Sequence, residues 1–258
     1  MGRALAAGIL RADPARAPAL RLADALPAVA EEAAAELRAQ LGNGAAGPTA
    51  AGVAEAGAAD LVCLAVKPGD VEAALSEVVP AMPSGAALLS VVAGWTLDRL
   101  AALAPGVPVV RTMPNLAVRH GAGLVAVATR GLDSDREAAL MALLGSLGTA
   151  TALPESLFPQ ATALAGSGPG FLALVAEGLE EGAVAAGLGR PQARRMVQAV
   201  MAGTAAMLAD GGDPALLRQR VSSPAGTTIE GIGVLERGAV RAHLADAVRA
   251  AAARARTL

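Results

Sequence analysis

The pattern of apolar and polar positions along the chain changes near its middle. From residue 20 to about residue 153, short apolar runs alternate with longer stretches of helical pattern. The short runs predict strands at 20–23, 61–66, 86–92, 107–111, 122–128 and 149–153. The longer stretches predict helices at 28–41, 71–79, 97–103 and 135–147. This alternation is typical of the α/β class with a parallel, doubly wound sheet.

After Pro154 the pattern is helical throughout, and glycine-rich joints interrupt it. Helices rich in alanine and glycine pack closely but bury little apolar surface within one chain, so dimerisation through this half is expected. The change in pattern predicts two domains. Residues 1–154 would form an α/β domain, and residues 155–258 a helical dimerisation domain.

Composition removes several classes of function. The 258 residues are 54% hydrophobic, which allows a sizeable core, yet no run of about 18 uncharged apolar residues predicts a membrane span. A formal charge of -2 without a basic block argues against nucleic acid as a partner. The single cysteine, Cys63, excludes an intrachain disulfide and favours the cytoplasm, and its apolar run predicts a buried thiol. Two distant histidines and one cysteine argue against a metal site.

The start of the chain is similar to part of a dinucleotide-binding fingerprint, in which a strand and G-x-G-x-x-G lead into a helix. Gly2 would be the last glycine, followed at once by its helix, and the strand and first two glycines are expected to be absent. We interpret this as a start codon assigned too late, since about ten residues would supply the missing part. A chain that is truncated and inactive is the alternative.

Two residues at strand ends are candidates for the cofactor site. Asp24 lies about 20 residues past the glycine turn, where an acid can bond a ribose 2′-hydroxyl, although such an Asp can also be a turn residue. An acid would repel a 2′-phosphate, but Arg21 and Arg38 could offset it, so NADH and NADPH both stay open. Lys67, the only lysine, follows the strand at 61–66, either beside an anionic cofactor or simply exposed in a loop.

A third candidate lies in the helical half. The segment from Ser222 to Thr228 reads Ser-Ser-Pro-Ala-Gly-Thr-Thr and precedes a helix. Its main-chain N–H groups and hydroxyls could bind a carboxylate. The alternative is an ordinary helix cap by serine or threonine.

Four segments together resemble the pyrroline-5-carboxylate reductase family. They are Leu-Ala-Val-Lys-Pro at 64–68, Val-Val-Arg-Thr-Met-Pro-Asn at 109–115, Thr-Ala-Leu-Ala-Gly-Ser-Gly-Pro at 162–169 and Arg-Val-Ser-Ser-Pro-Ala-Gly-Thr-Thr-Ile at 220–229. The last is the most specific. The sequence departs from the family at Gly52, Ala165 and Ala225, and with Leu-Ala at 116–117.

The resemblance implies a Rossmann-like domain followed by a helical dimerisation domain, and reduction of 1-pyrroline-5-carboxylate to L-proline with NADH or NADPH. It implies that Ser223, Gly226 and Thr227 hold the substrate carboxylate, and that Thr228 also binds substrate and acts at the ring nitrogen. The cofactor residues it implies are Gly2, Ala65, Val66, Lys67, Pro68 and Asn115, to which the spacing described above adds Asp24. Arg111 is interpreted as an ion-pairing or loop-anchoring residue.

The resemblance also bears on assembly and on competing functions. Members of the family commonly form homodimers, often stacked into decamers, and we expect the dimer here. A 3-hydroxyacid dehydrogenase would need a lysine in the helical half, which has none. An inactive paralogue and a reductase of a related cyclic imine stay as alternatives.

Overall fold

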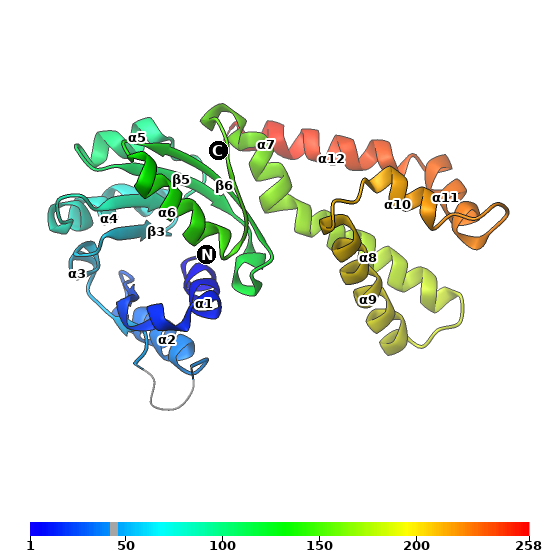
Figure 1. The fold of residues 1–258 in the computed structure, drawn as a ribbon, viewed down its shortest axis with the longest axis horizontal. Coiled ribbons are helices and arrows are strands. Elements are labelled where there is room, and N and C mark those ends of the chain that lie inside the picture. Colours follow the sequence, from blue (N-terminus) through cyan, green and yellow to red (C-terminus); the bar gives the residue numbers. More distant parts are fainter. Residues whose placement is uncertain (42–45, 258) are drawn as a thin grey trace. The chain divides into compact units, whose positions relative to one another are not determined.

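The computed structural model describes residues 1–41 and 46–257, which fall into two compact units (Figure 1). Unit 1 comprises Met1–Gly166 and Ala251–Leu258, and unit 2 comprises Ser167–Ala250. The last helix, α12 (Val240–Ala255), passes from unit 2 into unit 1.

Unit 1 contains a five-stranded and a two-stranded sheet. The larger has the order β3 (Leu61–Leu64), β4 (Ala87–Ser90), β5 (Val109–Pro114), β6 (Gly123–Arg130) and β7 (Gly148–Ala152). The smaller pairs β1 (Arg21–Leu22) in parallel with β2 (Thr49–Ala50). All six strands predicted from the sequence are confirmed. The additional strand, β2, lies between Pro48 and Gly52 in a stretch of alanine and glycine, where no apolar run marks it.

The direction of β6 differs from the expected all-parallel sheet. Strands β3, β4 and β5 are parallel, whereas β6 is antiparallel to β5, with Val109 opposite Arg130. Only the short turn η4 (Leu116–His120) joins β5 to β6, and a parallel connection requires a crossover of a dozen or more residues. The doubly wound class is confirmed, with β6 and β7 as a reversed pair at one end of the sheet.

Helices cover both faces of the larger sheet (Figure 1). On one face, Leu75 and Leu100 pack with Val62, Leu88 and Val109. On the other, leucines from the first and sixth helices pack with residues of β4 to β6. The helices of unit 1 are α1 (Gly2–Ala12), α2 (Pro27–Arg38), α3 (Val53–Gly57), α4 (Val71–Val78), α5 (Leu97–Leu103), α6 (Ser134–Gly145) and α7 (Phe158–Thr162).

Short helical turns connect these elements. They are η1 (Pro14–Ala19), η2 (Pro68–Asp70), η3 (Val79–Ala81), η4, η5 (Glu155–Leu157) and the π-helical turn η6 (Ala163–Ser167). Of these, η2 is the next element after β3, and η5 is followed at once by α7.

The expected burial of Cys63 is wrong, because its side chain is exposed. Along β3 the buried side chains are those of Val62 and Leu64, which alternate with Leu61 and Cys63. Within the described residues β3 pairs on one side only, with β4. All four residues of β4, which has a neighbour on each side, are buried. An edge strand therefore leaves uncovered a side chain that a central strand would bury.

Helices are the only regular secondary structure in the described part of unit 2, as the sequence predicted. Its helices are α8 (Gly168–Ala185), α9 (Arg190–Ala209), α10 (Pro214–Arg220), α11 (Thr227–Arg237) and most of α12. Glu180 of α8 accepts from Arg194 at 3.0 Å and from Arg190 at 3.1 Å, which joins α8 to α9. The hydrogen bond from Arg194 is the main reason why the pKa of the Glu180 carboxyl lies below its usual value.

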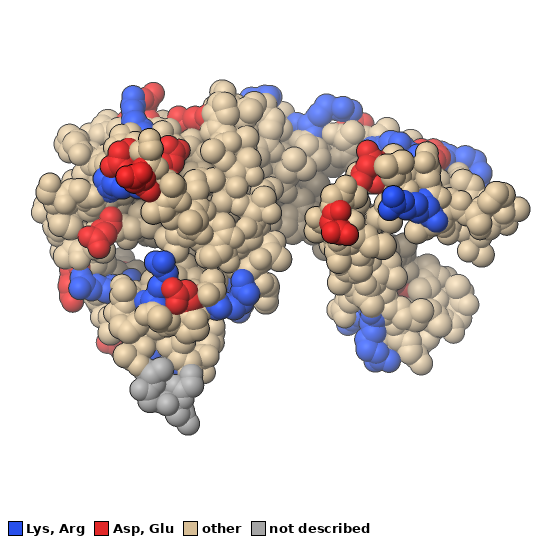
Figure 2. All heavy atoms as spheres, in the orientation of Figure 1, with Lys and Arg blue, Asp and Glu red and all other residues tan. Residues whose placement is uncertain are grey.

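Unit 2 has almost no interior of its own. Ala193 is the one buried residue among its described positions. Many large apolar side chains are instead exposed, and those on α8 and α9 include Leu172, Leu174, Leu179, Met196, Val200 and Met207. Figure 2 shows broad uncharged areas on this unit, whereas acidic and basic side chains are interspersed on unit 1. Apolar surface of this extent favours association with another protein surface.

Two further classes of feature are not found in the described part of the chain. None of its helices combines the length and apolar character needed to cross a membrane. Nor does it contain a group of three or more His, Cys, Asp or Glu side chains that could hold a metal ion.

Candidate functional site

The carboxyl ends of β3, β4 and β5 lie at one edge of the sheet, because these three strands are parallel. Lys67 and Pro68 follow β3, and Asn115 follows β5. The start of α1 is also here, since a Cβ placed on Gly2 would lie 3.3 Å from the Cβ of Ala65. The fold thus brings residues 2, 65–68 and 115, all predicted to contact the cofactor, to the edge where ligands bind in such sheets.

The start of α1 has the features of a phosphate site. The helix is 11 residues long, and its N-cap residue, Met1, provides no side-chain cap. The first N–H groups of such a helix have no partner within the helix, and the helix dipole favours an anion there. A side chain at position 2 would fill the narrow space beside Ala65, which glycine leaves open. These residues fit the diphosphate of a dinucleotide.

A tryptophan supports the turn that carries Lys67. The Trp95 indole N–H donates to the Pro68 carbonyl at 3.0 Å, and Trp95 itself is 4% exposed. The guanidinium carbon of Arg99 lies 3.9 Å from the centroid of the Trp95 ring. Within the turn, the Asp70 N–H donates to the Lys67 carbonyl at 3.0 Å. Lys67 is exposed on this braced turn, and its contact with a cofactor stays a prediction.

Replacing Trp95 with phenylalanine is expected to loosen this turn. The ring is retained, but the Pro68 carbonyl loses its donor, so the free energy of unfolding should fall by about 1–2 kcal/mol. Denaturant unfolding measures the loss, and hydrogen exchange at the Asp70 N–H should become faster. Unchanged stability together with unchanged exchange would contradict the role given to the indole. Arg99→Met, which leaves the indole bond in place, is the matched control.

Asp24 and Asn115 each have a local structural partner. Asp24 is exposed after β1, and its Oδ1 accepts from the Leu26 N–H at 3.0 Å, so it does form a turn. Its second carboxylate oxygen leaves the ribose role possible as a prediction. The Asn115 side-chain carbonyl accepts from the Leu124 N–H at 3.3 Å, which fixes the loop after β5.

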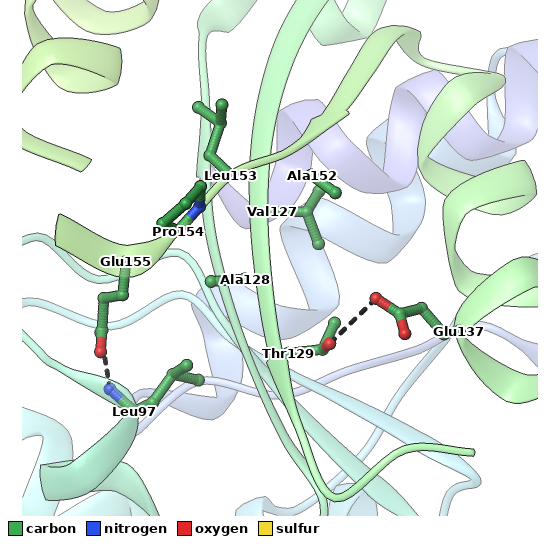
Figure 3. Close-up of a pocket in the computed structure, with 9 residues that line it drawn as sticks. All are labelled: Leu97, Val127, Ala128, Thr129, Glu137, Ala152, Leu153, Pro154 and Glu155. Carbon is green, nitrogen blue, oxygen red and sulfur yellow. Dashed lines mark hydrogen bonds between the residues drawn. The ribbon is translucent and has the colours of Figure 1, made fainter. Parts of the chain in front are cut away.

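Sequence reasoning missed the partner of Arg111. Glu155 Oε1 lies 2.8 Å from Arg111 Nη1. The same oxygen accepts from the Leu97 N–H at 2.8 Å (Figure 3). The same guanidinium lies over the buried ring of Phe158, 4.6 Å from its centroid. The interpretation of Arg111 as an ion-pairing residue is therefore confirmed. Glu155 gave no signal in the sequence because it lies 44 positions away from Arg111.

Glu155 also borders a cavity of about 370 Å³ (Figure 3). Its lining comes from the last residues of β6, the segment after β7 and the first turns of α5 and α6. Thr129 and Glu137 form a hydrogen bond of 3.0 Å across it. No residue predicted for the substrate or cofactor lines this cavity, so we do not place the reaction there.

The segment predicted to bind a carboxylate lies wholly in unit 2. Helix α11 begins after Gly226, and no side chain caps it, so the alternative of an ordinary Ser or Thr cap is wrong. The first main-chain bond of the helix runs from the Glu230 N–H to the Gly226 carbonyl at 3.4 Å. The N–H groups of Thr227 and Thr228 therefore point out of the helix end, where a carboxylate could accept from them.

The turn before α11 has an unusual backbone. The Gly226 N–H donates to the Ser223 carbonyl at 3.1 Å, and Ala225 between them has φ of 55°. That is the left-handed region, which glycine adopts more readily than alanine. A Cβ at Gly226 would lie 2.2 Å from Ser223 Oγ and 3.1 Å from the Ser223 carbonyl oxygen, so any other residue at 226 would force the Ser223 side chain to move. The turn nevertheless forms with alanine at 225, because the hydrogen bond from the Gly226 N–H to the Ser223 carbonyl is present.

The fold and the cofactor edge define a class, the Rossmann-like oxidoreductases with a helical second part. Residues 1–94 match the family described as NADP oxidoreductase coenzyme F420-dependent, and residues 155–258 match Pyrroline-5-carboxylate reductase dimerisation. The pyrroline-5-carboxylate reductase of Synechocystis is 35% identical over 208 residues, 79% of this chain and 76% of that protein. The chain belongs to the pyrroline-5-carboxylate reductase family.

Other comparisons agree with this assignment. The pyrroline-5-carboxylate reductase of Methanosarcina acetivorans is 38% identical over 203 residues, 77% of this chain and 75% of that protein. The structure of the Coxiella burnetii enzyme has a TM-score of 0.87 at 25% identity and covers 100% of this chain and 94% of its own. A Plasmodium falciparum pyrroline carboxylate reductase with NADP bound shares the fold, with a TM-score of 0.82 at 23% identity. Its structure covers 100% of this chain and 94% of its own. The resemblance and the fold class are confirmed.

Proposed function

We propose that this protein reduces 1-pyrroline-5-carboxylate to L-proline with NADH or NADPH, the last step of proline biosynthesis. The observation that carries the proposal is the uncapped start of α11, in a chain of this family, at the segment 220–229 that resembles the family's signature. A small anionic substrate fits free N–H groups at the start of a helix.

The substrate carboxylate would be held by Ser223, Gly226 and Thr227, mostly through main-chain N–H groups. Gly226 allows the close turn, and its N-cap position places the two following N–H groups at the helix end. The 11-residue length of α11 provides a dipole that favours the negative charge. This part of the site depends on backbone geometry more than on side-chain chemistry.

Thr228 would orient the imine. When bound, the reduced nicotinamide supplies the hydride that this reaction requires. A protonated C=N bond is already electrophilic, so the chain mainly has to hold the reacting rings face to face. The Thr228 hydroxyl, half-buried in the first turn of α11, would donate a hydrogen bond to the neutral ring nitrogen and relay to it a proton from water, which gives the protonated imine. The absence of tyrosine from the sequence removes a common alternative acid.

The cofactor would be held at the carboxyl edge of the sheet in unit 1. Gly2 at the start of α1 would face the diphosphate, and residues 65–68 would line the cleft beside it. Asp24 would contact the adenosine ribose, and Asn115 would lie near the nicotinamide. The hydrogen bonds that fix Asp24, Pro68 and Asn115 support this arrangement, because a preformed site loses less entropy on binding.

Assembly as a homodimer in the cytoplasm completes the proposal. Residues 1–154 would be the cofactor domain and residues 155–258 the substrate-binding and dimerisation domain, a division that the match over 155–258 supports. The exposed apolar side chains of unit 2 would then be covered by a second copy. Analytical ultracentrifugation should give twice the chain mass of 25.2 kDa.

A lone cysteine without a disulfide partner is compatible with a reducing compartment.

The activity is tested by oxidation of NADH and NADPH in the presence of 1-pyrroline-5-carboxylate. We expect turnover with this substrate and a much higher KM for 1-pyrroline, which keeps the imine but lacks the carboxylate. The difference reports on the carboxylate site at the start of α11. No turnover with either nucleotide would refute the proposed function, and equal KM values would refute the carboxylate site alone.

A further inference from the structure

The choice between NADH and NADPH is decided by what surrounds the adenosine ribose. NADPH carries a phosphate on the 2′-oxygen, where NADH carries a hydroxyl that can donate a hydrogen bond. A site for NADPH needs a cation at that point, whereas a site for NADH needs an acceptor. The relevant residues are those at the carboxyl end of β1 and the arginines close to it in sequence.

Asp24 provides an acceptor at this point. It lies two residues after β1, with its carboxylate exposed. Oδ1 is engaged by the Leu26 N–H at 3.0 Å, which fixes the direction of the side chain and leaves Oδ2 available. Its sequence neighbours Ala23, Ala25 and Leu26 carry no charge. A carboxylate accepts from ribose hydroxyls and repels a phosphate.

The guanidinium groups of the two arginines that could offset this charge each donate to a main-chain carbonyl that precedes a strand. Arg21 Nη1 donates at 3.0 Å to the carbonyl of Ala58, which precedes β3. Arg38 Nη1 donates at 2.6 Å to the carbonyl of Pro48, which precedes β2. Both guanidinium groups therefore lie where strands begin, whereas Asp24 follows the end of one. The cofactor binds outside the carboxyl ends of strands.

The helix that follows Asp24 adds negative charge. Glu31, Glu32 and Glu36 lie on α2, and the last two engage Arg3 of α1 at 3.4 and 3.3 Å. Arg3 also donates to the Val29 carbonyl at 3.3 Å, so this cation too is already bound. A phosphate placed beside Asp24 would meet that carboxylate, and Arg3, the arginine of α1, is already paired with Glu32 and Glu36.

We propose that Asp24 makes this protein selective for NADH. The inference rests on the proposed function, because it takes the carboxyl edge of unit 1 as the cofactor site. Asp24 accepts from the ribose hydroxyls of NADH and excludes the 2′-phosphate of NADPH by charge. The residues that would admit the phosphate, Arg21 and Arg38, donate to the carbonyls of Ala58 and Pro48, which precede β3 and β2.

Calorimetric titration with NADH and with NADPH, without imine substrate, tests the proposal on the full chain. We expect NADH to bind at least about tenfold more tightly, and Asp24→Asn to abolish most of the difference by strengthening NADPH binding. Asparagine keeps an oxygen for the Leu26 N–H, so the turn survives. The double variant Asp24→Ser/Ala25→Arg should reverse the preference, since it adds a cation beside the ribose.

Asp60→Asn is the matched control, because Asp60 is an exposed acid that precedes β3 at the opposite edge. It should leave the ratio of the two dissociation constants unchanged. Equal or tighter binding of NADPH by the unaltered chain would overturn the proposal, as would an unchanged ratio in Asp24→Asn. Binding of neither nucleotide would overturn it together with the cofactor site. NADH-selective binding without turnover of 1-pyrroline-5-carboxylate would refute only the proposed function.

Discussion

Replacing Thr228 with alanine is expected to lower kcat for 1-pyrroline-5-carboxylate reduction by roughly a hundredfold, the lower end of what one positioned proton donor contributes. The side chain lies in the first turn of α11, beside the N–H groups proposed to hold the carboxylate. Removing its hydroxyl leaves those groups unchanged. The loss should therefore fall on kcat, while KM for the imine rises little.

Thr228→Ser distinguishes a chemical role from a structural one. Serine keeps the hydroxyl, so most of the lost activity should return. Nucleotide affinity, measured without imine, should be the same in all three proteins because the cofactor residues lie in unit 1. A Thr228→Ala enzyme with unchanged kcat would refute the role of Thr228 and leave the carboxylate site standing.

Replacing Glu155 with alanine should reduce the free energy of unfolding of unit 1 by about 3 kcal/mol, because it leaves the mostly buried Arg111 guanidinium without a carboxylate partner. The Arg111 side chain is 11% exposed, and its Nε has no protein partner among the described residues even with Glu155 present. The Leu97 N–H at the start of α5 loses its acceptor in the same variant. Denaturant unfolding followed by circular dichroism measures the effect.

Two variants identify the cause of this loss. Arg111→Met in the Glu155→Ala background should recover part of the stability, since it removes the unpaired charge. Asp98→Ala breaks an ion pair of 2.6 Å with Arg130, but both side chains are more than half exposed, so we expect a change within about 1 kcal/mol. An effect of Glu155→Ala no larger than that of Asp98→Ala would contradict the buried role of the Arg111 pair.

The sequence predicted those elements whose signals are local. The predicted strands, including the two-residue β1, coincide with apolar runs, whereas β2 (Thr49–Ala50) lies among alanine and glycine residues without such a run. The reversal of β6 was not predicted, because it depends on how short the connection through η4 is. Cys63 was expected to be buried because it stands in an apolar run, and such a run does not reveal that β3 pairs on one side only among the described strands.

The candidate site likewise contains residues that a local sequence pattern identifies and residues that it does not. Motif residues such as Lys67, Asn115 and Thr228 could be named from the sequence, and their ligand contacts stay predictions. Glu155 could not be named, since its partner is distant along the chain. The support that Trp95 gives to Pro68 was equally hidden, because a lone aromatic residue predicts packing and not a particular hydrogen bond.

The position of Trp95 has an optical consequence. The chain has one tryptophan and no tyrosine, so its ultraviolet emission comes from a single ring in contact with the turn that carries Lys67. Reduced nicotinamide absorbs where indole emits, so a nucleotide bound at that edge should quench the ring by energy transfer. The helices from Ser167 to Ala250 contain no tryptophan and therefore contribute nothing to this emission. A fluorescence melt therefore reports the loss of the sheet, and a separate probe is needed to see the helical unit unfold.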